Sequence, residues 1–440
     1  MPVTSDISDV GVRARRRVAW RLLPFVFLLY VVAYIDRVNV SFAALRMNAD
    51  LGLGDRVFGL GVGIFYVSYV LFEIPGSIVV ERWSARKWIA RIMISWGLVT
   101  ILTGFVRTTG QFFAVRFFLG VAEASFLPGM IVYLTHWFRL RERSRAIACL
   151  YAAVPTASLV GSPLAGWLLG AHWRGLAGWR WLFMVEGTPA IVLGVITIFY
   201  LTDWPSQAHW LPQVEREWLI NELRAEVQAK KKIRDPTIMQ AFCDRRVLLL
   251  IAVWFLALAG SLGNIYWIPT FVKRFSGFSD RTVTSMLVIP ALIGLAGTLI
   301  NGWHSDKTGE RRWHAAIPLL AAGLMYGFLI PARQDVPLAL LLLLLASGLF
   351  YAYLPVCWSI PTMMLTESAA AATFGLINSF GQLGGLAGPA AIGFLNARTH
   401  LLAASFGLIA LAYVAAGALL LCLKIRNPLD VSQRSNQSEA

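Results

Sequence analysis

Long apolar runs, each about 20 residues in length and nearly free of charge, dominate the chain. A helix of about 20 residues spans the hydrocarbon core of a bilayer, so each run predicts a transmembrane helix. Twelve helices are predicted in this way, at residues 20–43, 58–80, 88–107, 111–135, 144–170, 180–201, 247–272, 282–303, 313–331, 337–363, 370–396 and 401–423. The pattern therefore indicates an all-α membrane protein.

A single long polar insert divides these helices six and six. Residues 210–218 within it place acidic residues at the start of a helical stretch, which is a helix-start signal. We expect the insert to be an amphipathic, water-facing connector rather than a third domain. The predicted organisation is an N-terminal six-helix bundle at residues 1–202, a linker at 203–246, and a C-terminal six-helix bundle with a tail at 247–440.

The two halves repeat one another. Residues 77–88 follow the second predicted helix and residues 302–313 follow the eighth, and both carry an acid, a base, a basic pair and a Trp in the same order. The offset of 225 residues nearly holds for Ser162-Pro163 and Gly388-Pro389 as well. A duplicated six-helix unit predicts two pseudo-symmetric bundles about a central cavity, the organisation of alternating-access transporters.

Charge fixes the expected orientation. The chain is 57% hydrophobic and 14% charged, which excludes a soluble domain of 440 residues, and its net charge of +15 is spread over short clusters between the apolar runs. Of the 39 Lys and Arg residues, 27 fall on one side of the predicted membrane and ten on the other. The positive-inside rule therefore places both termini and the linker in the cytoplasm, and we expect no nucleic-acid partner.

Signals for enzyme chemistry are poor. The four cysteines show no CxxC spacing, and the six histidines show no metal-ligand spacing. Gly59, Gly61 and Gly63 lie inside a predicted helix and fit helix packing better than phosphate binding. No Walker-type loop is present, so we expect no enzyme activity, no cofactor, no metal and no transport driven by ATP. The first apolar run is too long for a cleavable signal peptide.

Several motifs carry a family resemblance. The loop with Gly302, Asp306, Gly309 and Arg311 resembles the cytoplasmic signature of the major facilitator superfamily, and residues 116–120 resemble its fourth-helix motif. More narrowly, residues 34–39, 72–75, 116–123 and 303–313 resemble the anion:cation symporter branch, which includes bacterial permeases for sugar acids, tartrate and phthalate. The resemblance covers nearly the whole chain and implies the major facilitator fold. It departs in the first loop, where Glu81 and Ser84 stand in place of the usual Asp and Gly.

Four charged residues lie within predicted helices and are the main candidates for transport chemistry. Asp36 and Arg37 are adjacent on the first helix, and Arg116 and Glu123 are seven apart on the fourth, which puts them on one helix face. Intramembrane charges usually face a water-filled cavity or a partner, and a guanidinium can hold a carboxylate bidentately. If all four met across the cavity, two acids and two bases would share one site.

The resemblance implies that Asp36 and Glu123 carry protons and that Arg37 and Arg116 bind the anion. A structural interpretation is also open. Adjacent helical residues point about 100° apart, so Asp36 and Arg37 cannot face the same way and one of them could bridge to another helix. Arg116 lies in a motif of the whole superfamily, so its role could be packing or gating.

Softer candidates for substrate binding are polar or aromatic residues near predicted cavity positions. Asn378 and Gln382 share a face of the eleventh predicted helix. Prolines interrupt the tenth predicted helix, which leaves backbone groups without helical partners near a cavity. Tyr66 is expected to be an interface anchor or lipid-facing bulk, and Glu73 a structural residue at a helix end. The substrate-binding candidates beside the arginines are Tyr34, Tyr69, Trp358, Ser359, Asn378 and Gln382.

Charged residues of the two repeated loops are expected to form a cytoplasmic gate. They could bridge helices at the cytoplasmic face and hold the outward-open state closed inside, although the basic ones could serve membrane topology alone. These residues are Glu81, Arg82, Arg86, Asp306, Lys307, Arg311 and Arg312.

The sequence thus predicts a monomeric secondary transporter of the bacterial inner membrane. We expect it to import a small organic carboxylate with protons by alternating access. Sodium coupling, uncoupled transport and export of an organic anion remain open, because ion and direction depend on details of the site. Which carboxylate is carried is not readable from the residues.

Overall fold

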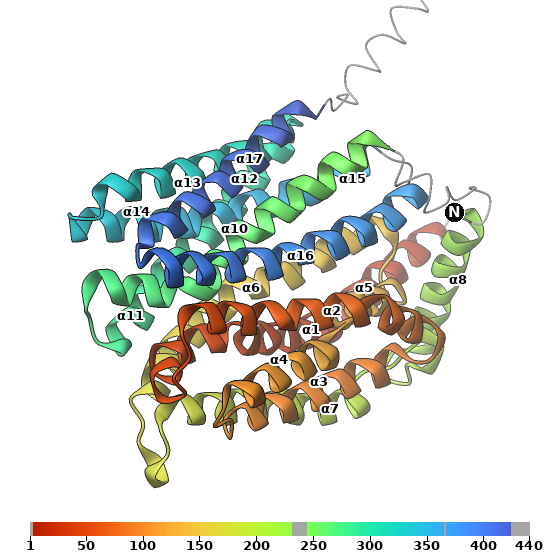
Figure 1. The fold of residues 1–440 in the computed structure, drawn as a ribbon. Helices are drawn as coiled ribbons and strands as arrows, with labels where there is room; N and C mark the ends of the chain where they lie inside the picture. Colours follow the sequence, from red (N-terminus) through yellow and green to blue (C-terminus); the bar gives the residue numbers. More distant parts are fainter. Residues whose placement is uncertain (1–2, 231–243, 365–366, 424–440) are drawn as a thin grey trace, which may run out of the picture.

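The computed structural model describes residues 3–230, 244–364 and 367–423. Within these ranges the chain is helical with short turns and contains no strand (Figure 1), which confirms the predicted all-α class. Part of the basic stretch predicted for the linker and the basic tail from residue 424 onward lie outside the described residues.

The N-terminal helices pack together as one bundle, with α3 against α7, α1 against α6 and α7, and α2 against α4. One predicted helix, 111–135, is divided into two because Ser125 adopts a left-handed conformation with φ of 63°. The helices are α1 (Val3–Asp50), α2 (Asp55–Arg82), α3 (Ala85–Thr103), α4 (Thr109–Glu123), α5 (Phe126–Thr135), α6 (Leu140–Leu169) and α7 (Gly178–Tyr200).

The C-terminal helices form a second bundle, in which α10 packs against α16 and α17, and α13 against α17 (Figure 1). Two predicted helices are divided here, 282–303 into α11 and α12, and 337–363 into α14, η3 and α15. The elements are α10 (Arg245–Ser276), α11 (Asp280–Met286), α12 (Val288–Thr308), α13 (Arg312–Ala332), α14 (Val336–Leu349), η3 (Phe350–Tyr353), α15 (Leu354–Met364), α16 (Glu367–Thr399) and α17 (Leu402–Cys422).

By length and composition, ten helical segments of the described chain are long and apolar enough to cross a membrane. The segments α3 and α16 are not among them, but α3 packs against α7 and α16 packs against α10 and α2 within the bundles. With these two included, the described residues form the predicted twelve-helix arrangement.

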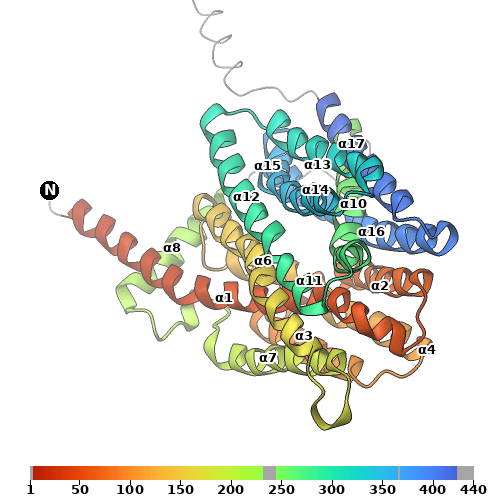
Figure 2. The ribbon, with the colours of Figure 1, turned by 90° about the vertical axis from the view of Figure 1, so that its left-hand side faces the viewer.

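The linker helix α8 (Gln213–Lys230) lies against the N-terminal bundle rather than free in solvent (Figure 2). Glu215 of α8 pairs with Arg17 of α1 at 2.9 Å, and Glu222 pairs with Arg139 at 2.7 Å. Helix α1 begins at Val3, well before the predicted start at residue 20, and its basic stretch from Arg13 to Arg17 has α8 as a partner.

The two bundles meet along α2 and α16, along α1 and α10, and where α6 contacts α11 and α12. Glycine permits the closest of these approaches. A Cβ on Gly59 of α2 would lie 2.5 Å from the carbonyl oxygen of Pro389 in α16. A Cβ on Gly61 would overlap the Phe112 ring of α4. The predicted packing role of these glycines is confirmed.

Candidate functional site

An ion pair lies inside the N-terminal bundle, between Arg37 of α1 and Glu123 of α4. Their side chains are only 15% and 5% exposed. Glu123 is the last residue of α4, where the helix dipole disfavours negative charge. The Arg37 guanidinium compensates for this, because a paired charge costs far less to bury than a lone one.

Arg116 lies on the same face of α4 as Glu123 and is 2% exposed. Its Nε donates to the carbonyl oxygen of Gly61 at 3.3 Å, and its guanidinium carbon lies 4.9 Å from the Phe65 ring centre. Its Nη2 has no hydrogen-bond partner among the described residues. A buried donor without an acceptor is costly, so this atom is suited to bind an acceptor from outside the chain.

Aromatic side chains surround Arg37. Its guanidinium carbon lies 5.7 Å from the ring centre of Tyr34, 5.5 Å from that of Tyr69 and 5.9 Å from that of Phe65, within cation–π range. Both tyrosines predicted for substrate binding therefore lie beside the ion pair.

Tyr66 is neither an interface anchor nor lipid-facing, as the sequence had suggested. It is 1% exposed, and its hydroxyl lies 3.0 Å from that of Tyr266 of α10. The prediction was wrong because one turn of α2 faces the other bundle rather than lipid, and helix spacing alone does not identify the neighbour.

Asp36 does not join the ion pair. It faces a different side of α1, where it accepts hydrogen bonds of 2.7 Å from Asn39 Nδ2 and Thr100 Oγ1, and it is 3% exposed. The expectation of two acids and two bases in one site is therefore corrected to three charged groups, with Asp36 behind them. The reason is the 100° angle between adjacent helical residues.

The predicted residues of the C-terminal bundle are scattered. Asn378 of α16 lies at the contact between bundles, where its Nδ2 donates to Glu73 at 2.9 Å. Gln382 is half-buried farther along α16. Trp358 packs edge-on against Trp254 with ring centres 4.4 Å apart, and Ser359 donates to its own helix.

The position of Glu73 differs from the predicted one at a helix end. It does not end a helix, because α2 continues through Pro75 to Arg82. It is 3% exposed and accepts a hydrogen bond from Asn378 of the other bundle. A second buried acid that the sequence analysis did not single out is Glu186 of α7. The available signal for it was a lone acid within a predicted apolar helix.

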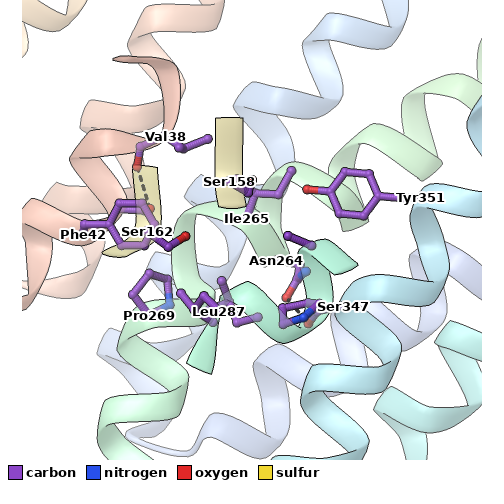
Figure 3. Close-up of a pocket in the computed structure, with 14 residues that line it drawn as sticks. Val38, Phe42, Ser158, Ser162, Asn264, Ile265, Pro269, Leu287, Ser347 and Tyr351 are labelled. Carbon is purple, nitrogen blue, oxygen red and sulfur yellow. Dashed lines mark hydrogen bonds between the residues drawn. The ribbon is translucent and has the colours of Figure 1, made fainter. Parts of the chain in front are cut away.

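A small cavity of about 50 Å³ lies between the bundles. Asn264 and Ser347 line one side and Phe42 and Ser162 the other (Figure 3). The four charged candidates and the residues Tyr34, Tyr69, Trp358, Ser359, Asn378 and Gln382 do not line it. Ligand pockets commonly measure about 300–1,000 Å³, so this cavity is too small to enclose an organic acid in this conformation.

Ion pairs join the bundles at the end of the molecule away from α8. Arg46 at the end of α1 pairs with Asp280 at the start of α11, and Asp280 also pairs with Lys273 at 2.9 Å. Arg274 of α10 pairs with Asp55 of α2 at 2.6 Å. The Arg46–Asp280 and Arg274–Asp55 pairs, called the outer ties below, connect helices of opposite halves.

The predicted gate residues make contacts within their own halves. Arg86 donates to the carbonyl oxygens of Ile198 and Leu201 at the end of α7. Arg312 donates to the carbonyl oxygen of Leu421 at the end of α17. Arg311 pairs with Asp306 at 2.6 Å, and Lys307 lies over the Trp303 ring. The side chains of Glu81 and Arg82 lie outside the description. Their role as a gate stays a prediction.

One acid of the second loop organises the start of α13. Glu310 accepts the backbone N–H of Trp313 at 2.9 Å and contacts the ring of His314, which in turn lies 2.7 Å from His304. Burial opposes ionisation, but these hydrogen bonds outweigh it and lower the pKa of Glu310. The loop is therefore held by an ionised helix cap at neutral pH.

Similar proteins are found by sequence and by fold. A family model described as Major Facilitator Superfamily matches residues 26–389 and again residues 277–440. A protein of Agrobacterium vitis named as a tartrate transporter is 44% identical over 393 residues, covering 89% of this chain and 90% of that protein. A quinolone resistance transporter of Acinetobacter baumannii is 38% identical over 391 residues, covering 88% and 90%. The crystal structure of a D-xylose–proton symporter is similar in fold, with a TM-score of 0.72 at 15% identity, covering 91% of this chain and 97% of that one.

Proposed function

Because the chain belongs to the major facilitator superfamily and is therefore a transporter rather than an enzyme, we propose that it imports an organic carboxylate together with protons. It works in the bacterial inner membrane as a monomer, by alternating access between two six-helix bundles at residues 1–202 and 247–440. The linker at 203–246 and both termini are cytoplasmic.

The observation that carries this proposal is that Nη2 of Arg116, beside the Arg37–Glu123 ion pair, has no partner within the described residues. The pair is neutral as a unit, so Arg116 leaves one positive charge in the cluster. A carboxylate is the ligand that this charge favours, since charge-assisted hydrogen bonds to guanidinium are strong. The name of the Agrobacterium relative supports an organic acid such as tartrate.

Proton coupling follows from competition for Arg37. When Glu123 takes a proton, Arg37 loses its ionised partner and becomes free to hold the substrate carboxylate together with Arg116. Binding of proton and anion are then mutually favourable, which is the thermodynamic requirement for symport. Asp36 behind them serves as a further proton carrier, and Tyr34 and Tyr69 form the aromatic wall of the site. Release of both species inside restores the Arg37–Glu123 pair.

Asn378, Gln382, Trp358 and Ser359 approach the substrate when the bundles rearrange. The loop residues Glu81, Arg82, Arg86, Asp306, Lys307, Arg311 and Arg312 close the cytoplasmic side when the outer ties open.

Transport by the purified protein in proteoliposomes tests the function directly. With an alkaline interior and no sodium, we expect tartrate or another acid from a panel of sugar acids, dicarboxylates and aromatic acids to accumulate above its equilibrium level. A protonophore should abolish the accumulation. Uptake that requires sodium, or that never exceeds equilibrium, contradicts proton symport.

Export of an organic anion is the second candidate function, and the similarity to the quinolone resistance transporter favours it. The same vesicles distinguish the two directions when the pH gradient is reversed and quinolones join the panel. In an exporter that exchanges its substrate for protons, protons leaving an acidic interior drive the substrate in, so accumulation with an acidic interior and none with an alkaline interior would identify an exporter.

Weakening the outer ties is expected to favour the outward-open state. Asp280→Asn removes the acid that holds Arg46 and Lys273. Partly exposed ion pairs are worth about 1 kcal/mol, so the outward-open population should rise roughly fivefold. The measurement is labelling of a cysteine placed at Ser162, in a background without native cysteines, by a maleimide that does not cross the membrane. The control is Arg281→Gln at an exposed neighbour. Equal labelling rates in Asp280→Asn and the parent contradict the role of the ties.

A further inference from the structure

Glu186 is a buried acid to which the proposed transport cycle gives no role. It lies on α7, which packs against α3 and α1, and it is 4% exposed. Neither oxygen of its carboxyl group has a hydrogen-bond partner in the described part of the chain. An ionised carboxylate without a donor is among the costliest groups to bury in a membrane protein. Glu186 is therefore expected either to be protonated or to have a function that justifies the cost of burying its charge.

The surroundings of Glu186 contain a second acid. The carboxyl group lies in the field of Asp36 of α1 and next to the amide of Asn39, one turn along the same helix. The same Asn39 donates to Asp36 at 2.7 Å, and the Thr100 hydroxyl of α3 donates to it as well. Glu123 of α4 adds its own field at Asp36.

Asp36 and Glu186 differ in the hydrogen bonds that their carboxyl groups receive. Asp36 receives two donated hydrogen bonds, which stabilise a carboxylate, whereas among the described residues Glu186 has only the Asn39 amide nearby and no hydrogen bond of normal geometry. Two buried carboxylates that lie in each other's field repel when both are ionised, so a single proton shared by the two residues relieves the repulsion. The hydrogen bonds place the negative charge on Asp36 and the proton on Glu186.

We propose that Asp36 and Glu186 form a buried carboxyl pair that binds one exchangeable proton, a site within the N-terminal bundle distinct from the Arg37–Glu123 ion pair. The proposal rests on proton symport as the proposed function. The proton leaves the pair when α1 moves and water reaches it, and the two charges then repel until a proton returns. Because Asp36 and Arg37 are adjacent on α1, proton loss on one side of that helix is linked to anion binding on the other.

Glu186→Gln tests the pair. The amide keeps the shape but removes the second negative charge, so Asp36 alone should bind its proton less tightly. We expect the pH profile of proton-driven uptake to shift toward acid by about one unit or more, because repulsion between paired carboxyls separates their titrations by that amount. Substrate counterflow, which needs no net proton movement, should be retained. Glu186→Asp keeps a carboxyl group and should restore much of the parental profile.

A spectroscopic readout complements transport. In infrared spectra of the substrate-free protein, the band of a protonated carboxyl group should change with pH and be missing from Glu186→Gln. An unshifted pH profile or a band that does not titrate overturns the proton site and makes Glu186 a permanently neutral structural acid. Loss of counterflow by the folded variant also overturns it. If the parent itself shows no proton-driven accumulation, the proposed function fails instead, which is a distinguishable result.

Discussion

Replacement of Glu123 by Gln is expected to abolish proton-driven accumulation of the substrate. The amide cannot carry a proton, and it leaves Arg37 permanently free of an ionised partner, so anion binding no longer depends on proton binding. Transport that is not coupled to protons cannot exceed equilibrium, so accumulation should fall to the level reached without a pH gradient. Uptake driven by a pH gradient in proteoliposomes, compared with counterflow in the same vesicles, is the measurement.

Counterflow should survive this change, since it requires the anion site but no net proton transfer. The double variant Arg37→Gln with Glu123→Gln controls for the cost of an unpaired buried arginine. Glu222→Gln, at the pair with Arg139 on the linker helix, is the matched acid-to-amide control and should transport normally. If uptake by the Glu123 variant stayed fully pH-dependent, the assignment of Glu123 as a proton carrier would be wrong. Asp36→Asn is expected to act in the same direction.

Replacement of Arg116 by Gln is expected to abolish substrate binding. Truncating one side of a buried hydrogen-bonded charge pair costs about 2–5 kcal/mol, so the Kd for the carboxylate should rise roughly 100-fold or more. Arg116→Lys should also bind weakly, because an ammonium lacks the second nitrogen of the guanidinium fork. The measurement is the stabilisation of the purified protein by substrate in a thermal-shift titration, which depends on ligand concentration relative to Kd.

The same titration separates binding from folding. Since Nη2 of Arg116 has no partner in the described chain, its removal should leave the melting temperature without substrate unchanged or higher. Arg398→Gln is the control, because Arg398 lies over the Phe394 ring at 5.5 Å, far from the ion pair in sequence and on the other bundle. A variant at Arg116 that melts lower yet is still stabilised by the acid would show that the arginine is structural.

The helices were predictable from the sequence because their cause is local. In a bilayer every backbone polar group must be satisfied within its own segment, so a long apolar run has few alternatives to helix. The breaks within three of the predicted helices were not visible. Ser125 takes a left-handed conformation where no glycine signals it, and a Cβ at Gly76 would overlap Ser125 Oγ of the neighbouring segment. Such a turn is held by packing from another helix.

The site was predictable in part. The spacing of Arg116 and Glu123 put them on one face, and the aromatic neighbours Tyr34 and Tyr69 lie beside Arg37 as the sequence had suggested. The partner of each charge was not predictable. Glu73 and Glu186 each stand alone among apolar neighbours in the sequence, and their surroundings come from Asn378 and Asp36 on helices that are distant along the chain.

By itself, the sequence determined the membrane class, the helices and the repeated halves, since hydrophobicity and helical periodicity act over neighbouring residues. It also placed charged residues where a bilayer does not tolerate them without cause. Only the tertiary structure decided that Arg37 pairs with Glu123, that Asp36 turns toward Thr100 and Glu186, and that Arg116 keeps a donor with no partner in the described part of the chain. A helix fixes the angle between its own side chains, whereas the groups they meet depend on how several helices pack.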